Sequence, residues 1–269
     1  TFKEIAYAIK NHPNEYDQYV KAAMKKGLRY PDACNQALSL LLNKSIQTPN
    51  DLLGLGYVKE VIENDYPITL HCIKRSNDYH DTTLTKIASR KALKEKQDVH
   101  DYLLDMSYYD SLFHQNDFFD YLKYQIIIQS PTQLKKIHLV DEGIENLLKK
   151  VIFDTNSYEE LVNSLTSKRY TKTRIQRMLL HILMNNTKDE IKNCFPIDYI
   201  HVLKMNQKGQ KYLKTIKKTC SYHIITNLSS YKHPALDLEI KSSKLLSLID
   251  HQMIKKEFQN IPVIELSKR

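Results

Sequence analysis

The stretch TPNDLLGLGYVKEVIE, residues 48–63, combines a helical pattern with two closely spaced glycines in a chain that has only five. Pro49 and Asn50 are helix-start signals, Asn being a strong N-cap. Apolar residues then recur at helical spacing, namely Leu52, Leu55, Val58 and Ile62. A glycine inside a helix costs about 1 kcal/mol relative to alanine. Gly54 and Gly56 therefore indicate that a ligand or another backbone comes close, with tight packing against a sheet as the simplest explanation.

The residues after this helix favour an open α/β arrangement. The run ITLHCIKR, residues 68–75, is β-like, and TKIASR, residues 85–90, opens a further helix. A strand between two helices is typical of a parallel α/β sheet, which binds ligands at strand carboxyl ends and helix N-termini. The earlier strands of that sheet are not found in this chain. We expect Asn50 to bond a nucleotide there, and Arg75 to offset phosphate charge or hold a base.

The two glycines do not form a known phosphate-binding motif. Lys59 takes the third glycine position of G-x-G-x-x-G, and no P-loop is present.

The chain changes character near residue 97. Residues 101–128 are aromatic and acidic and then helical, and three amphipathic helices are expected over 143–153, 157–165 and 173–185. The β-like runs VLKMN and YHIITNL flank a helical QKGQKYLKTIKK, residues 207–218, which predicts a small β-α-β unit. We therefore predict two domains, 1–96 and 97–269.

Basic residues are clustered in this second part. The net charge is +9, which suits a polyanionic partner. Residues 161–186 contain no Asp or Glu, and residues 199–236 contain seven lysines and again no acid. The cations of the first stretch are Lys168, Arg169, Lys172, Arg174 and Arg177.

The sharpest basic piece is KRYTKTRIQRMLLHIL, residues 168–183. Thr171 is a suitable cap, and Ile175, Leu179 and Ile182 are expected to face the core while the arginines face away. Helix N–H groups and guanidinium groups would converge on an anion such as phosphate. A solvated basic helix, or arginines paired with the acidic segments of the same domain, explains the pattern equally simply.

Several function classes find no support in the composition. The four cysteines form no C-x-x-C pair and have no zinc-ligand spacing, so we expect reduced thiols in the cytoplasm and no metal site. There is no apolar run of membrane-spanning length and no signal peptide. The chain opens at Thr1 directly in a helical pattern, which we interpret as a piece of a longer polypeptide.

The ordered set of motifs resembles the bacterial tRNA(Met) cytidine acetate ligase family, within the HUP-type nucleotidyltransferases. The resemblance covers almost the whole chain. It rests on PNDLLGLGYVKE, IKRSNDYHD, the hydroxyl-rich helix start that ends at Arg90, FFDYLKYQII, EGIENLLKK, KRYTKTRIQRMLLHIL and VLKMNQKGQKYL, in that order.

The resemblance implies a fold and a reaction. The chain would be mainly α with α/β parts: residues 1–96 are the C-terminal part of a HUP-type domain, and residues 97–269 a helix-rich, basic, tRNA-binding domain with a small β-α-β unit. ATP, with Mg²⁺, would activate acetate as acetyl-adenylate, and the acetyl group would pass to N4 of the wobble cytidine of elongator tRNA(Met). Asn50 and Arg75 match the ATP-contacting positions, Arg90 would contact phosphate, and the basic helix would bind tRNA.

This sequence departs from the family pattern in three places. The family's N-terminal H-x-G-H segment, which stabilises charge on phosphate, is not found in the chain, so no catalytic residue is assigned. Fragment 1–269 is accordingly expected to form no acetyl-adenylate by itself. The helix start at 85–90 has a shifted hydroxyl pattern, and Asp51 stands where many relatives have Asn. A carboxylate there would repel phosphates unless it faces away or meets Mg²⁺.

Two other functions remain open on the sequence alone. A non-catalytic RNA-binding protein on the same scaffold would keep the basic surface, and another adenylyltransferase of the same fold would keep the nucleotide contacts.

Overall fold

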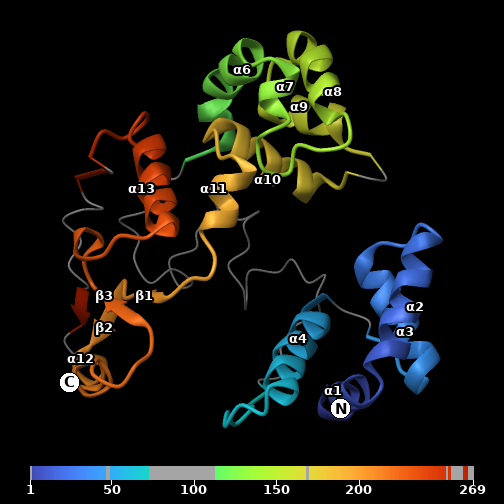
Figure 1. Cartoon of the computed structure of the whole chain (residues 1–269). Helices are drawn as coiled ribbons and strands as arrows, with labels where there is room; N and C mark the ends of the chain where they lie inside the picture. Colours follow the sequence, from blue (N-terminus) through green and yellow to red (C-terminus); the bar gives the residue numbers. More distant parts are fainter. Residues whose placement is uncertain are drawn as a thin grey trace, which may run out of the picture. The chain divides into compact units, whose positions relative to one another are not determined.

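The computed structural model describes residues 2–46, 49–72, 113–167, 170–252, 254–255 and 263–265. The chain divides into two compact units, Thr1–Tyr109 and Asp110–Arg269, which follow one another along the colour bar of Figure 1. The domain boundary predicted near residue 97 falls outside the described residues. Within the described ranges, every helix is too short or too polar to cross a membrane.

The described part of the first unit is helical. Its elements are α1 (Phe2–Asn11), α2 (Pro13–Lys25), α3 (Tyr30–Leu42) and α4 (Pro49–Glu63). Helix α2 packs on α3, and α1 packs on α4. Gly27, at φ +88°, follows the end of α2 and has the left-handed conformation that commonly ends a helix. The Lys10 ammonium bonds the Ile62 carbonyl at 2.7 Å and the Asp65 carboxylate at 2.8 Å, which ties α1 to the end of α4.

The two glycines of α4 have different surroundings. A Cβ added at Gly54 would lie 3.0 Å from Cε2 of Phe2, whereas a Cβ at Gly56 would meet nothing within 4 Å. The close neighbour of Gly54 is therefore a side chain of helix α1. The expectation of packing against a sheet is wrong at this position, because helix α1 covers this side of α4.

The strand expected over residues 68–75 is not formed in its described part. Residues 67–72 have no regular secondary structure, and Ile68, His71 and Cys72 are exposed. A β-like sequence becomes a strand only where a partner supplies the ladder of hydrogen bonds, and no partner lies beside it among the described residues. Residues 73–75 fall outside them.

The second unit begins with a helical bundle. Its elements are η3 (Gln115–Phe118), α6 (Phe119–Ile128), α7 (Pro131–Leu134), α8 (Ile144–Val151), η4 (Ile152–Asp154), α9 (Tyr158–Leu165), α10 (Lys172–Leu183) and α11 (Lys188–Asn193). The three amphipathic helices predicted from the sequence are thus confirmed as α8, α9 and α10. Their apolar faces meet in one core, which includes Leu122, Ile126, Leu148, Leu161 and Ile175.

One lysine secures the end of α6 within this bundle. The last carbonyl groups of a helix have no partner in the helix itself. The Lys149 ammonium, from α8, supplies partners by donating to the carbonyls of Ile126, Ile127 and Gln129 at 3.0, 2.7 and 2.8 Å. The contact joins α6 and α8 and so fixes two walls of the bundle.

A small parallel β-α-β region follows the bundle. It contains β1 (Tyr199–His201), β2 (Lys204–Asn206), α12 (Gln207–Ile216), β3 (His223–Ile225), η5 (Leu228–Ser230), α13 (Pro234–Leu246) and β4 (Val263–Glu265). The predicted unit is present, but the two strands that flank α12, β2 and β3, do not pair with each other. Strand β3 pairs in parallel with β1, Ile200 opposite Ile224, while β2 pairs with β4. Figure 1 shows the strands together, with α12 beside them.

Candidate functional site

The basic helix α10 begins where the sequence predicts. Thr171 is its N-cap, with the side-chain oxygen accepting the Arg174 backbone N–H at 3.4 Å. The cap satisfies one of the free N–H groups of the first turn. Lys168 and Arg169, which precede the helix, lie outside the described residues.

The apolar side of α10 fixes the direction of its polar side. Ile175, Leu179 and Ile182 are buried, as predicted, and Met178 joins them in the core. Exposing these side chains to water would cost several kcal/mol of hydrophobic free energy. The helix therefore cannot rotate about its axis. Its arginines are therefore presented in fixed directions.

Arg174 covers an aromatic ring. Its guanidinium carbon lies 4.6 Å from the centroid of the Tyr170 ring, within cation–π range. Tyr170 is buried, and its single hydroxyl proton is shared between the Asp141 carbonyl at 2.9 Å and the Glu142 carboxylate at 3.0 Å. Tyr170 is thus a packing residue with both ends engaged, and it presents no open face for a nucleic-acid base.

The arginines of α10 are not neutralised by the acidic segments. Among the described residues, neither Arg174 nor Arg177 makes an ion pair with a carboxylate, and Arg177 is exposed. Lys172 does approach Glu159, at 3.8 Å, but both side chains are more than half exposed, so the pair contributes little. Two of the predicted RNA contacts therefore remain available to an external anion.

His181 does not extend this positive surface. It is half-buried, lies edge-on to His138 at 4.7 Å between ring centroids, and is 3.3 Å from the Asn186 amide. Burial lowers the pKa of His181, and the neighbouring His138 and Arg177 lower it further. The ring is therefore neutral at physiological pH.

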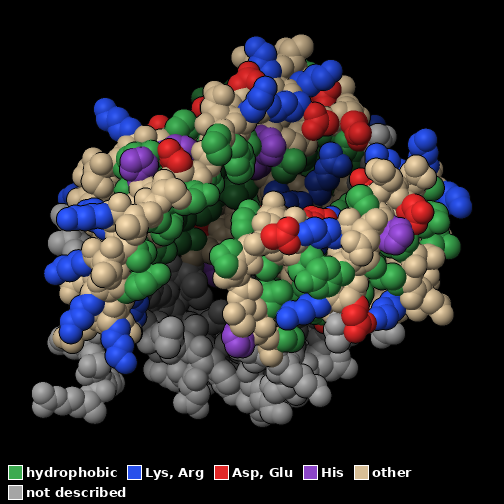
Figure 2. Space-filling model, turned by 60° about the horizontal axis from the view of Figure 1, so that its bottom comes forward, with side chains coloured by type: hydrophobic (Ala, Val, Ile, Leu, Met, Phe, Trp, Pro, Cys, Tyr) green, Lys and Arg blue, Asp and Glu red, His purple; other side chains and the backbone are tan. Residues whose placement is uncertain are grey.

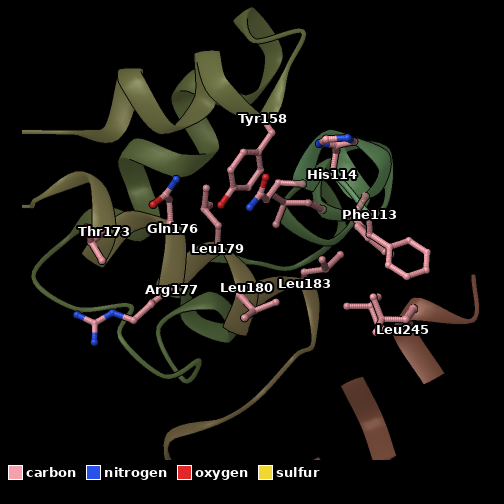
Figure 3. Close-up of a pocket in the computed structure, with 14 residues that line it drawn as sticks. Phe113, His114, Tyr158, Thr173, Gln176, Arg177, Leu179, Leu180, Leu183 and Leu245 are labelled. Atoms are coloured by element: carbon pink, nitrogen blue, oxygen red, sulfur yellow. The ribbon is translucent and has the colours of Figure 1, made fainter. Parts of the chain in front are cut away.

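A cavity of about 360 Å³ adjoins the exposed side of α10. Its lining comes from α10, from η3 and the residue pair before it, from α6, from α9, and from the end of α13. Figure 3 shows Tyr158, Gln176 and Leu179 around its middle, with Arg177 at one margin and Phe113 and Leu245 at the other. Sequence reasoning did not find this cavity, although Thr173, Gln176 and Leu180 share one helical face.

Helix α12 carries a second basic surface. Lys208, Lys211 and Lys214 are exposed along it, with Lys217 and Lys218 just beyond its end. No residue of α12 is buried. Figure 2 shows Lys and Arg side chains spread over the face in view, with Asp and Glu side chains between them.

The predicted nucleotide-binding residues are described only in part. Asn50 lies in the first turn of α4, as predicted, although its side chain is not among those described. Arg75 and Arg90 fall outside the described residues. Asp51, also in the first turn, is half-buried and already engaged in an interaction. The structure therefore positions the helix start and leaves the other contacts as predictions.

The described residues contain no group of three or more His, Cys, Asp or Glu side chains placed to hold a metal ion. Cys34 and Cys194 are buried as free thiols, and Cys72 is exposed.

Comparison with known proteins matches the chain to one family of nucleotidyl transferases. The family model for the HIGH Nucleotidyl Transferase matches residues 1–260. The tRNA(Met) cytidine acetate ligase of Geobacillus sp. (strain WCH70) is 34% identical, over 98% of this chain and 73% of the relative. The ligase of the same name from Bacillus subtilis (strain 168) is also 34% identical, over 96% of this chain and 68% of the relative.

A solved structure shows the same fold. The crystal structure of Thermotoga maritima TmcAL bound with alpha-thio ATP superposes with a TM-score of 0.77, at 22% identity, over 98% of this chain and 73% of that chain. The match supports the nucleotidyltransferase-type fold expected from the sequence.

Proposed function

The chain belongs to the HIGH nucleotidyl transferase family, among the tRNA(Met) cytidine acetate ligases, and on that premise we propose that it serves the ATP-dependent acetylation of tRNA. Acetate is the acyl donor, and N4 of the wobble cytidine of elongator tRNA(Met) is the acceptor. The acetylation is proposed to take place in the cytoplasm.

The first unit is proposed to hold ATP at the start of α4. Asn50 would contact the nucleotide, together with Arg75, and Arg90 would contact phosphate. The described residues fit in one respect, because α4 is a helix of 15 residues and a helix N-terminus favours an anion. The Asp51 carboxylate in the same turn suits a bound Mg²⁺ better than a bare phosphate. When bound, ATP supplies the activation of acetate as acetyl-adenylate.

The second unit is proposed to bind the tRNA. The observation that carries this part is that Arg177 is exposed and Arg174 half-buried, both without a carboxylate partner among the described residues, on a helix locked by its buried face. Guanidinium groups form forked hydrogen bonds with phosphate, so a fixed pair suits an RNA backbone. Lys168, Arg169 and Lys172 would add contacts around the helix start.

Acetyl transfer tests the proposed activity directly. The whole protein is incubated with ATP, radiolabelled acetate and elongator tRNA(Met), and label is measured in the tRNA and located by nuclease digestion. We expect ATP-dependent label on the wobble cytidine when the polypeptide also carries the family's H-x-G-H segment, and no label with residues 1–269 alone. Tight tRNA binding without acetyl transfer would instead support the non-catalytic RNA-binding alternative.

Charge reversal tests the proposed surface. The double variant Arg174→Glu with Arg177→Glu is expected to weaken tRNA binding by tenfold or more at about 0.1 M salt. The slope of log affinity against log salt should become shallower by about 1.5 to 2, since two phosphate contacts are lost. The matched control is Lys21→Glu with Lys25→Glu, an exposed pair on α2 with the same charge change. Equal effects of the two double variants would contradict a specific role for α10.

A further inference from the structure

The cavity beside α10 is built on one face of that helix. Thr173, Gln176, Arg177 and Leu180 all line it, and their spacing of i, i+3, i+4 and i+7 defines a single helical stripe. The stripe runs beside the buried residues of α10. The same packing that fixes the arginines therefore fixes this wall of the cavity.

The remaining walls are apolar and partly aromatic. Phe113 and Phe118 come from the segment before α6, and their rings lie 6.4 Å apart and tilted by 52°. Leu245 and Leu246 close the cavity from α13. Lys241 of α13 holds this helix near α11. Its ammonium donates to the Asn185 carbonyl at 3.3 Å and lies 3.8 Å from the Glu190 carboxylate of α11.

Several uncharged polar side chains line the cavity, namely Gln115, Tyr158, Thr173 and Gln176. Among the described residues, neither the Gln176 amide nor the Tyr158 hydroxyl makes a hydrogen bond, and both side chains are half-buried. Burial raises the pKa of Tyr158, so its hydroxyl keeps its proton. Both side chains line the cavity, so a polar ligand bound there can supply their hydrogen-bond partners (Figure 3).

The charge of the lining is one-sided. It contains one side chain with a permanent charge, the Arg177 guanidinium, and no Asp or Glu. Arg174 precedes Arg177 by three residues on the same helix. A ligand with an anionic end would therefore meet guanidinium at the margin of an otherwise uncharged cavity.

We propose that this cavity holds an unpaired nucleotide of the bound RNA, and the proposal rests on the proposed function. The base would lie among the aromatic and leucine side chains, its edge would bond Gln176 and Tyr158, and its phosphate would meet Arg177. Proteins recognise unpaired RNA bases by this combination of stacking and hydrogen bonds to the base edge. A volume of about 360 Å³ is within the usual range for small-molecule sites.

A purely apolar occupant fits the cavity less well. A hydrocarbon or a leucine-rich peptide segment would bury the Gln176 amide and the Tyr158 hydroxyl without partners, which costs roughly 1–3 kcal/mol for each group. A nucleotide can match all three features of the lining. Its base packs on the apolar walls, its base edge bonds Gln176 and Tyr158, and its phosphate pairs with Arg177.

Tryptophan fluorescence tests the proposal, because the chain contains no tryptophan. The variant Phe113→Trp places one fluorophore in the cavity wall. Elongator tRNA(Met) and a short single-stranded RNA are expected to quench it saturably, since a base stacks against the indole. A duplex RNA with the same number of phosphates should quench it weakly. Equal quenching by duplex and single strand, or no quenching by bound tRNA, would overturn the proposal.

Filling the cavity gives a second measurement. Leu180→Trp is expected to lower the affinity for single-stranded RNA at least tenfold and leave the affinity for duplex RNA nearly unchanged. Leu147→Trp, at an exposed leucine of α8 outside the cavity, is the matched control and should change neither. Circular dichroism confirms that each variant is folded. Equal losses for both RNAs, or equal losses in both variants, would contradict a nucleotide in the cavity.

The outcomes separate this proposal from the proposed function. A Phe113→Trp protein that acetylates tRNA without any change in fluorescence would keep the function and remove the nucleotide site. If acrylamide cannot quench the introduced indole in the RNA-free Phe113→Trp protein, the cavity is already occupied by another part of the chain, and the proposal is again overturned. Absence of any tRNA binding by the parent protein would remove the function itself.

Discussion

Helices α10 and α12 are both basic and both lack acidic residues, yet the fold holds them differently. Helix α10 buries Ile175, Met178, Leu179 and Ile182, whereas α12 buries no residue. The described cations of α10 are mostly arginines, and those of α12 are lysines. A locked helix with arginines can make directed contacts with individual phosphates, while an exposed helix with lysines attracts a polyanion without fixing its position.

The largest expected effect tests the difference in anchoring. Ile175→Ala should lower the free energy of unfolding of the second unit by about 2–5 kcal/mol, because it removes a fully buried side chain from the core. Leu213→Ala, at a half-buried position of α12, should lower it by well under half as much. Urea unfolding followed by circular dichroism measures both. Similar losses for the two variants would show that α12 is anchored as firmly as α10.

The next effect separates geometry from charge. Arg174→Lys with Arg177→Lys keeps the charge and removes the forked donors, so tRNA affinity should fall by about three- to tenfold, roughly 1 kcal/mol, with the salt dependence unchanged. Lys211→Arg with Lys214→Arg on α12 should leave affinity almost unaltered. Filter binding at several salt concentrations checks both. If the arginine pair tolerates lysine without loss, the contacts of α10 are not directed.

The smallest effect concerns the caps. The Thr171 oxygen accepts from the Arg174 N–H at 3.4 Å, and the Asn206 oxygen accepts from the Gly209 N–H at 2.8 Å. Thr171→Ala should lower global stability by about 0.5–1 kcal/mol, since α10 belongs to the core. Asn206→Ala should mainly speed hydrogen exchange in the first turn of α12, with the melting temperature nearly constant. A global loss from Asn206→Ala would place α12 in the same cooperative unit as α10.

The sequence predicts best what local chemistry decides. The cap at Thr171 and the buried face of α10 depend on residues within three or four positions of one another, so periodicity and capping rules find them. The glycine pair shows the limit of such reasoning. Gly54 does mark a close approach, but which element approaches is decided by the tertiary fold, and it is α1.

Pairing and cavities depend on residues far apart in the chain. The β-like residues 68–72 form no strand because a partner strand is needed, whereas the short β1 forms because β3 lies beside it. The cavity beside α10 needs Phe113 and Leu245 as well as Gln176, across more than a hundred residues. Only the helical stripe of Thr173, Gln176 and Leu180 is visible in the sequence. That stripe mixes polar and apolar residues and so gives a weak signal.

The contact between Arg174 and the Tyr170 ring sets a threshold for whatever binds there. To reach out to an incoming anion, the guanidinium must give up an attraction that is worth about 0.5–1 kcal/mol at a partly exposed site. A weak or singly bonded anion returns too little to displace it, while a phosphate held in a fork returns more. An anion that draws Arg174 off the Tyr170 ring must therefore return more free energy than this contact provides.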